Sequence, residues 1–347
     1  MGLLKTPQVK GVLLEEFVLR LLANAGYRIL DGNENSAGIK KESSGLYLQG
    51  RGHWHQTDAL VAYDYTPAFI YPIRLIVEAK AYSSSSSNNG KVGLNIIRNA
   101  VGVLKDVNEN YFSLSNTDSG DSNTHSDEYK IKRYNYTYAI FSLNGFTENA
   151  QKYAIAHQVF LIQYYYNHLF DRIRILFENF NADDLYSNLS LGDIRKTTRR
   201  IFARDAHYSG IATLPEEIRD FVESLSIELS NIRGSYFGLL NGEYPIHLIS
   251  TSEIGDVNDE EEVEVYLPEP GLVKLYLNDI ELFFELPHHL ANIFNSVWKN
   301  RLEVANTKAR YINYISLTGR IAGRQRNIIL RPNRTWLDSY IEMLRAR

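Results

Sequence analysis

The chain has 347 residues, a hydrophobic fraction of 44% and a net charge of −4 at pH 7. This length allows two domains with sizeable cores, and the negative charge excludes a general nucleic-acid coat, so any nucleic-acid surface must be local. There are no cysteines, which excludes disulfides and thiolate zinc sites. Because the sequence contains no apolar stretch of membrane-spanning length and no secretory signal, we expect a cytoplasmic protein without a membrane partner.

A helix is predicted near the start of the chain, between Gly11 and Tyr27. Its apolar residues recur at helical spacing, and Gly26 is well placed to end it. Glu15 lies beside the apolar stripe, whereas Glu16 is expected to turn towards solvent. We therefore favour Glu15 over Glu16 as a site residue. The alternative is that both are ordinary first-turn acids stabilised by the helix dipole.

Two strands are predicted next, at 60–63 directly after Asp58 and at 73–81. Alternate side chains of a strand share a face, so Glu78 and Lys80 should point together. Carboxylates on neighbouring strands can hold a hard divalent cation through oxygen ligands, and a lysine beside them suits phosphodiester hydrolysis. For Glu78 and Lys80 alone, a salt bridge at a strand end is the alternative.

Taken together, these residues resemble the Mrr-like branch of the PD-(D/E)XK restriction endonuclease superfamily. The likeness lies in the glutamate-bearing first helix, in Gly-Arg-Gly-x-x-His-Gln-x-Asp at 50–58 and in Val-Glu-Ala-Lys at 77–80. It continues through segments 91–104, 138–154 and 159–162. Many Mrr-like proteins carry Gln at the position of Glu78, so this chain has the more acidic variant. The resemblance implies an α/β restriction-endonuclease-like core, in which a central mixed sheet is flanked by helices.

The resemblance also implies a role for each motif residue. Asp58 and Glu78 would ligate Mg²⁺ or Mn²⁺ together with the Ala79 carbonyl, and Lys80 would orient or help deprotonate the attacking water. Glu15 would hold a metal-bound water or a second ion. The candidate contacts with a nucleic-acid backbone are Arg51, His55, Gln56, Arg98 and Asn99. A structural role for His55, and a solvated helix face for Arg98 and Asn99, are the alternatives.

Beyond residue 165 no family resemblance is visible. A helical connector is predicted at 166–212, and its last helix, at 193–204, is strongly basic because it carries Arg195, Lys196, Arg199 and Arg200. This helix could neutralise phosphate, lie in solvent or pair with the acidic tract at 256–264.

An α+β domain is predicted at 213–347. Its expected helices and strands alternate, and they are helices 215–232, 287–306 and 334–344 and strands 236–240, 245–250, 262–267, 272–277, 280–286, 311–317 and 327–330. A tight turn is expected at Asn278-Asp279. The arginine-rich turn that carries Arg320, Arg324 and Arg326 is the best candidate for nucleic-acid or partner contact outside the nuclease core.

We therefore expect a metal-dependent endonuclease that cleaves double-stranded DNA, with a nuclease domain at 1–165 and a C-terminal domain that reads target, partner or trigger. The resemblance implies an effector of a prokaryotic restriction or anti-phage system, with a partner protein of that system. Because both strands must be cut, a homodimer is a reasonable expectation. The alternatives are a nuclease acting on RNA or on both nucleic acids, and a non-catalytic nucleic-acid-binding scaffold.

Overall fold

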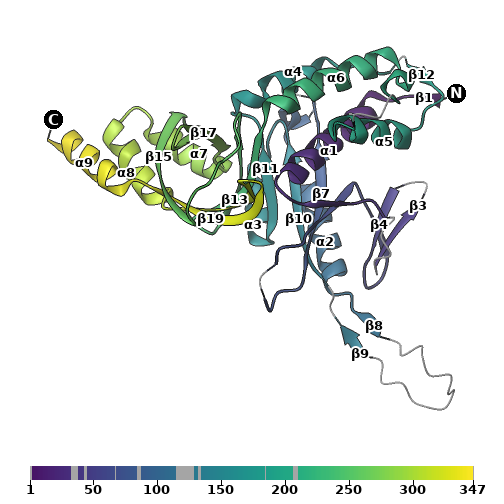
Figure 1. The fold of residues 1–347 in the computed structure, drawn as a ribbon, viewed down its shortest axis with the longest axis horizontal. Helices are drawn as coiled ribbons and strands as arrows, with labels where there is room; N and C mark the ends of the chain where they lie inside the picture. Colours follow the sequence, from purple (N-terminus) through teal and green to yellow (C-terminus); the bar gives the residue numbers. More distant parts are fainter. Residues whose placement is uncertain are drawn as a thin grey trace.

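The computed structural model describes residues 2–32, 38–42, 45–66, 68–83, 87–114, 129–131, 134–183, 185–205 and 210–346. Figure 1 shows a sheet with its covering helices beside a second body of curved strands, which ends in the C-terminal helix. The chain thus folds into two packed parts, each built around its own β-structure.

The N-terminal part is built on a five-stranded sheet in the order β11-β10-β7-β6-β2. The parallel strands β7, β10 and β11 are joined on one side by β6, which runs antiparallel to β7, and by β2, antiparallel to β6. The strand bounds are β2 (Arg28–Leu30), β6 (Ala59–Tyr63), β7 (Ile73–Lys80), β10 (Asn135–Ser142) and β11 (Val159–Gln163). The apolar runs of β6 and β7 arise because both faces of the sheet are covered.

Helices cover the two faces of this sheet. On one face α1 (Thr6–Asn24) packs in the same apolar core as Leu75 and Val77 of β7. On the other face α2 (Leu94–Asn108) and α3 (Glu148–Ala156) share a core with Ile76. This division follows from the alternation of side chains along a strand. No helix among the described residues has both the length and the hydropathy that a membrane span requires.

Three further helices gather around α1: α4 (Asp171–Asn179), α5 (Leu191–Phe202) and α6 (Glu216–Asn231). Helix α5 lies against α1, and α6 contacts α1, α4 and α5. Helix α5 begins with a capping box, in which the Ser190 side chain accepts the Asp193 N–H and the Asp193 carboxylate accepts the Ser190 N–H. Because helices, the sheet and the second part all pack around α1, its side chains are buried almost all round.

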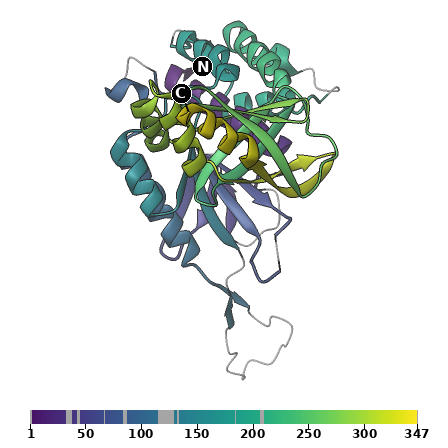
Figure 2. The ribbon, with the colours of Figure 1, turned by 90° about the vertical axis from the view of Figure 1, so that its left-hand side faces the viewer.

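Shorter elements complete this part. They are β1 (Gly2–Leu3), β3 (Ile39–Glu42), β4 (Gly45–Gln49), β5 (Trp54–Thr57), β8 (Phe112–Leu114), β9 (Tyr129–Ile131), β12 (Tyr186–Ser187), η1 (Ser87–Gly90), η2 (His168–Phe170) and η3 (Gly210–Thr213). Strands β3, β4 and β5 form an antiparallel sheet that leads directly to Asp58. The β8–β9 pair extends away from both parts in Figures 1 and 2.

Seven strands of the described C-terminal residues close into a barrel in the order β13-β14-β17-β16-β15-β19-β18. Their bounds are β13 (Gly234–Leu240), β14 (Tyr244–Ser250), β15 (Glu260–Glu269), β16 (Leu272–Leu277), β17 (Ile280–Glu285), β18 (Ile315–Ile321) and β19 (Arg324–Pro332). The barrel closes where β18 pairs antiparallel with β13, with Tyr236 opposite Gly319. In Figure 2 the barrel, coloured green to yellow, faces the viewer.

The closed barrel makes the predicted fold class wrong. A restriction-endonuclease-like α/β core followed by an α+β domain does not account for a barrel domain. Local patterns located the strands, but closure depends on pairing between segments far apart in sequence, such as β13 and β18, and on a parallel contact between β15 and β19. Nothing in the alternation within a single strand specifies such partners.

The helices of the barrel part also differ from prediction. Instead of one helix at 287–306, there are two, α7 (His288–Val297) and α8 (Arg301–Tyr311). The break is stabilised by Asn300, whose side chain accepts the N–H groups of Leu302 and Glu303 and so caps α8. The chain ends with α9 (Arg334–Arg345), which packs against α8.

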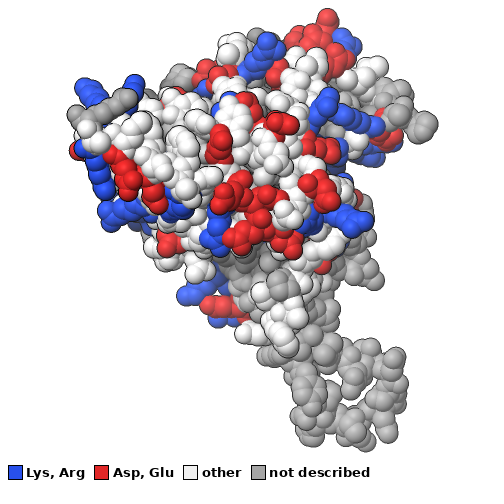
Figure 3. All heavy atoms as spheres, turned by 60° about the vertical axis from the view of Figure 1, so that its left-hand side comes forward, with Lys and Arg blue, Asp and Glu red and all other residues white. Residues whose placement is uncertain are grey.

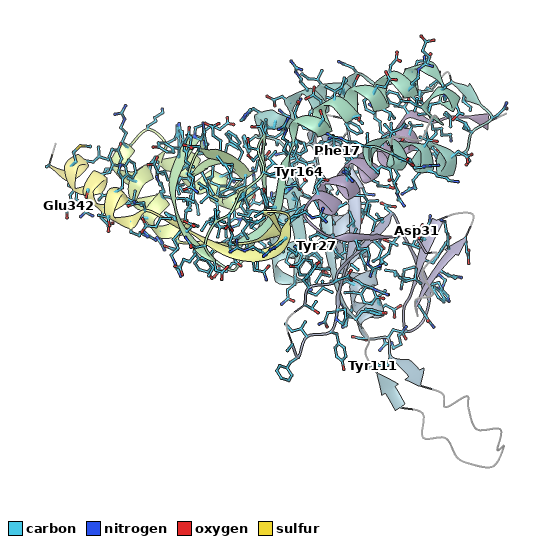
Figure 4. The ribbon with its side chains drawn as sticks, viewed as in Figure 1. Phe17, Tyr27, Asp31, Tyr111, Tyr164 and Glu342 are labelled. Carbon is cyan, nitrogen blue, oxygen red and sulfur yellow. The ribbon has the colours of Figure 1, made fainter. Side chains whose placement is uncertain are left out.

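The two parts share one continuous core. Phe17 of α1 and Tyr164, labelled in Figure 4, both contact Phe170, with ring centroids 6.0 and 3.8 Å from it. The Tyr164 hydroxyl lies 2.8 Å from Nδ1 of His247 in β14, and Ser235 of β13 lies 2.9 Å from Nε2. This core contains residues from both sides of the predicted segment boundaries at 165–166 and 212–213. The division of the chain at these boundaries stays a prediction.

Candidate functional site

Asp58, Glu78 and Lys80 meet at one end of the β6–β7 pair. Lys80 Nζ lies 2.7 Å from Glu78 Oε1 and 3.6 Å from Asp58 Oδ2. The Lys80 ammonium group therefore contacts both carboxylates. Asp58 Oδ2 and Glu78 Oε1 lie close to each other, because both contact the same ammonium group. All three side chains are largely buried, but each keeps some exposed surface, so the site is open to solvent.

The strand register explains this convergence. Ala59 of β6 pairs with Val77 of β7, so the next positions outward, Asp58 and Glu78, stand opposite each other. Side chains of facing residues in an antiparallel pair are close neighbours. Lys80 joins them because it lies two residues after Glu78 on the same face of β7. The three-residue arrangement thus follows from strand geometry.

Tyr138 of β10 is a further member of the site that the sequence did not indicate. Its hydroxyl donates a hydrogen bond to Glu78 Oε2 at 2.7 Å. Burial, followed by the neighbouring Glu78 charge, raises the pKa of Tyr138, so the phenol remains a donor. Glu78 is thereby held from both sides, by Lys80 on one oxygen and by Tyr138 on the other. The signal available in the sequence was that Tyr138 shares the alternation of the β10 strand, but a tyrosine in a strand is usually a packing residue.

Helix α1 brings Glu15 to the edge of this site through an arginine of α5. Arg195 Nη2 lies 2.6 Å from Glu15 Oε2, and its Nη1 donates to the Asp58 backbone carbonyl at 3.1 Å. Burial, and then the Asp58 charge, raises the pKa of Glu15 to about 7, although Arg195 opposes the shift. Arg195 therefore links the helix carboxylate to the loop that carries Asp58.

Glu16 is buried, and the expectation that it turns towards solvent is wrong. Only 1% of Glu16 is exposed, and both of its carboxylate oxygens accept hydrogen bonds at 2.7 Å from Arg199. The reason is that α5 packs on the side of α1 that would otherwise face water. The basic helix pairs with carboxylates other than those of the acidic tract at 256–264. Arg195 and Arg199 pair with Glu15 and Glu16, and Arg200 pairs with Asp205.

Burial and neighbouring charges shift the pKa values of Asp58 and Lys80. Burial raises the pKa of Asp58, with a further contribution from Glu78, while Lys80 acts in the opposite direction. For Lys80, burial alone would lower the pKa, but Glu78 and Asp58 outweigh it and raise the pKa above its ordinary value. A lysine in this setting stays protonated near neutral pH. Asp58, whose proton affinity is elevated by burial, is also a group that an added cation would stabilise in the ionised form.

The donor set fits a hard divalent cation in its chemistry. Asp58 and Glu78 supply carboxylate oxygens, which Mg²⁺ and Mn²⁺ prefer, and they already converge on the positive charge of Lys80. Within the described residues, no three or more His, Cys, Asp or Glu side chains gather closely enough to bind an ion by themselves. An ion here would complete its coordination with substrate oxygens or water, as Mg²⁺ commonly does.

Arg51, His55 and Arg98, which are three of the five predicted nucleic-acid contacts, interact with other side chains of the fold. His55 of β5 lies 2.7 Å from Asp106 of α2, and Arg51 lies 2.8 Å from Glu109. Gln56 is exposed on β5. Arg98 and Asn99 are exposed on α2, with the Arg98 guanidinium 5.9 Å from the Tyr153 ring centroid. His55 thus joins β5 to α2, and a backbone-contact role for these five residues stays a prediction.

The acidic tract at 256–264 pairs with arginines of the barrel itself. Arg326 contacts Asp256 and Asp259 at 3.6 and 2.6 Å, and Arg331 forms an ion pair with Glu260. In Figure 3 acidic and basic side chains are intermingled over the face that comes forward. Arg326 of the predicted arginine-rich turn is therefore already paired with carboxylates.

Comparisons with known proteins assign the chain to no family. No protein-family model matches it, and no curated protein matches its sequence. A solved structure of a protein of unknown function, AF1548, is similar at 16% identity and a TM-score of 0.33, over 62% of this chain and 95% of that chain. A likeness at that level carries no argument about fold or function.

Proposed function

We propose that this protein is a divalent-metal-dependent phosphodiesterase that hydrolyses nucleic acid, with double-stranded DNA as its expected substrate. The observation that supports the proposal is the convergence of Asp58 and Glu78 on the ammonium group of Lys80. Facing carboxylates provide hard oxygen ligands, and the adjacent ammonium provides a cation for the negative charge that develops on phosphate.

Each residue of the site has a distinct task under this proposal. Asp58 and Glu78 would hold Mg²⁺ or Mn²⁺, which when bound polarises a phosphate oxygen and lowers the pKa of water. Lys80 would act as a charged hydrogen-bond donor to phosphate or to the attacking water rather than as a base, because its neighbours raise its pKa. Tyr138 would orient Glu78 through the hydrogen bond to Oε2.

The first test is cleavage by the purified full chain. Plasmid DNA, linear duplex DNA, single-stranded DNA and RNA of matched sequence are incubated with Mg²⁺, Mn²⁺ or EDTA. We expect cleavage of duplex DNA with either ion and none in EDTA. Asp58→Asn, Glu78→Gln and Lys80→Ala should each lower the rate on the order of 10²-fold or more, as loss of one preorganised electrostatic group does.

The matched control is Asp64→Asn. Asp64 follows the opposite end of β6, is half exposed and pairs with Arg28 at 2.8 Å, so its loss should leave the cleavage rate unchanged. Circular dichroism of each variant checks that it is folded. Cleavage by Lys80→Ala at the wild-type rate under Mg²⁺ would show that the cleavage does not come from this site and would favour a non-catalytic scaffold. Cleavage of RNA alone would overturn the choice of DNA.

A further inference from the structure

A polar hollow lies where α1, α5 and α6 meet the barrel, and Asp58, Glu78 and Lys80 are not part of its lining. Its volume is about 580 Å³. The basic side chains in its lining are all arginines and come from four places in the fold: Arg20, Arg204, Arg233 and Arg320. The lining also includes the hydroxyl residues Ser226, Ser230 and Tyr236, and one acid, Glu253.

The four arginines reach this hollow from separate elements. Arg20 is half-buried in the last turns of α1, and Arg204 follows the end of α5 with a left-handed φ of 56°. Arg233 directly precedes β13, and Arg320 lies on β18; both are exposed. A left-handed backbone is usually taken by glycine at this position after a helix, so an arginine there carries a conformational cost.

Among the residues that the structure describes, these four arginines have no carboxylate partner, in contrast to the arginines of α5 and those that neighbour the acidic tract. Arg195, Arg199 and Arg326 each form ion pairs. Across the described parts of the chain, no carboxylate lies within ion-pair distance of the four arginines of the hollow. The pKa of Arg20 is lowered by burial and then by the positive charges of Arg204 and Arg320. Like charges held together are costly unless an anion compensates them.

We propose that this hollow binds a compact anion that carries two or more phosphate groups. Guanidinium groups bind phosphate oxygens through paired N–H donors, and four of them can engage more than one phosphate. Hydroxyls of Ser226 and Tyr236 can add hydrogen bonds. The volume lies within the range of small-ligand pockets. A concave site between helices and barrel suits a small molecule better than a duplex, which follows extended basic surfaces.

Such a ligand would stabilise the junction of the two parts, because its contacts would come from α1, α5, α6 and the barrel together. Arg20 lies one helical turn beyond Glu16, and Arg204 follows the helix that carries Arg199. The site is nevertheless separate from Asp58, Glu78 and Lys80, and its occupancy can be measured without any cleavage.

Inorganic tripolyphosphate is the probe, and the full chain is used in EDTA at physiological ionic strength. Calorimetric titration should show one-to-one binding, and the melting temperature should rise with tripolyphosphate but not with chloride of equal ionic strength. The Arg233→Ala/Arg320→Ala double variant removes exposed side chains only, and it should weaken binding by about tenfold or more, since each charge-assisted hydrogen bond to phosphate contributes strongly.

The control removes the same net charge elsewhere. Lys299→Ala/Arg301→Ala changes two exposed side chains at the start of α8, and it should bind tripolyphosphate as the wild type does. Absence of tripolyphosphate binding, or equal loss in both double variants, would overturn the proposal. A duplex oligonucleotide is titrated in parallel. If only duplex binding depends on Arg233 and Arg320, the hollow belongs to a nucleic-acid surface and the compact ligand is wrong.

Discussion

Glu285 shows at the scale of one residue what burial does to a carboxyl group in this fold. It ends β17, is 8% exposed and accepts the Asn167 N–H at 2.7 Å. Burial raises the pKa of Glu285 to about 8, even though backbone N–H groups at Tyr166, Asn167 and Tyr165 favour the ionised form. Between its ordinary pKa near 4.5 and this value, the folded chain holds a proton that the unfolded chain has released.

This difference predicts that the folded state loses stability as pH rises through neutrality. Because the folded state binds the proton more tightly, the free energy of unfolding should decrease with pH by at most about 1.4 kcal/mol per unit. Glu285→Gln mimics the protonated group and should remove this contribution. Urea denaturation at pH 6 and pH 8 should show a loss about 2 kcal/mol larger for the wild type than for the variant.

The control for this comparison is Glu281→Gln on the same strand. The pKa of Glu281 is lowered by hydrogen bonds from Lys274 and Tyr276, so the group is ionised throughout this range in both states. It should keep the wild-type pH dependence. Equal losses for wild type and Glu285→Gln would show that Glu285 is ionised in the fold.

At the scale of elements, helices α1 and α5 are joined by charges as well as by apolar contacts. Arg199 donates two hydrogen bonds to the buried Glu16, and Arg195 contacts Glu15 and the Asp58 carbonyl. A buried ion pair gains little over an apolar contact of the same shape, but breaking it leaves an uncompensated charge. The α1–α5 pair therefore constrains both the packing of the helices and the loop that holds Asp58.

Arg199→Met should destabilise the fold by about 3 kcal/mol, because the buried Glu16 would lose both hydrogen bonds to Arg199 and keep only the longer contact with Arg195, at 3.7 Å. The double variant Glu16→Met/Arg199→Met should recover most of that loss, since two apolar side chains can pack where the ions were. Urea denaturation of both single variants and the double variant measures the coupling.

Arg200→Met serves as the neighbouring control. Arg200 pairs with Asp205, and its side chain is 44% exposed, so its loss should cost no more than about 1 kcal/mol. A loss for Arg199→Met as small as this would show that water or another group compensates Glu16.

At the scale of the whole molecule, closure of the barrel requires close approach of β13 and β18. Gly238 of β13 faces Leu317 of β18, and a Cβ placed on Gly238 would lie 2.4 Å from the Ser316 carbonyl oxygen. This atom belongs to the backbone of a paired strand, so it cannot move aside without disturbing the ladder. Glycine is thus required by the backbone contact that closes the barrel.

Gly238→Ala should lower the free energy of unfolding by about 1–3 kcal/mol, as overpacking of a closed core does. The matched control is Gly102→Ala on the exposed side of α2, where an added Cβ meets no atom within 4 Å. That change should stabilise the chain by about 1 kcal/mol through helix propensity. Equal stability of Gly238→Ala and wild type in urea would show that the two strands can separate slightly without cost.

Several features of this protein could be predicted from sequence because they are local. The period of two in β7 placed Glu78 and Lys80 on one face, and the order of short strands placed Asp58 beside them. The turn at Asn278 joins β16 to β17 as expected, with a left-handed φ of 53°. Each of these depends only on backbone geometry within a few residues or between neighbouring strands.

Tertiary structure decided the remaining features because their partners are distant in the chain. Closure of the barrel brings Gly238 against Ser316, and the helix charges Glu16 and Arg199 meet across more than half of the chain length. The four arginines of the hollow likewise converge from three helices' ends and a barrel strand. Alternation and helical period determine which way a side chain points from its own element, but they contain no information about which other element packs against it.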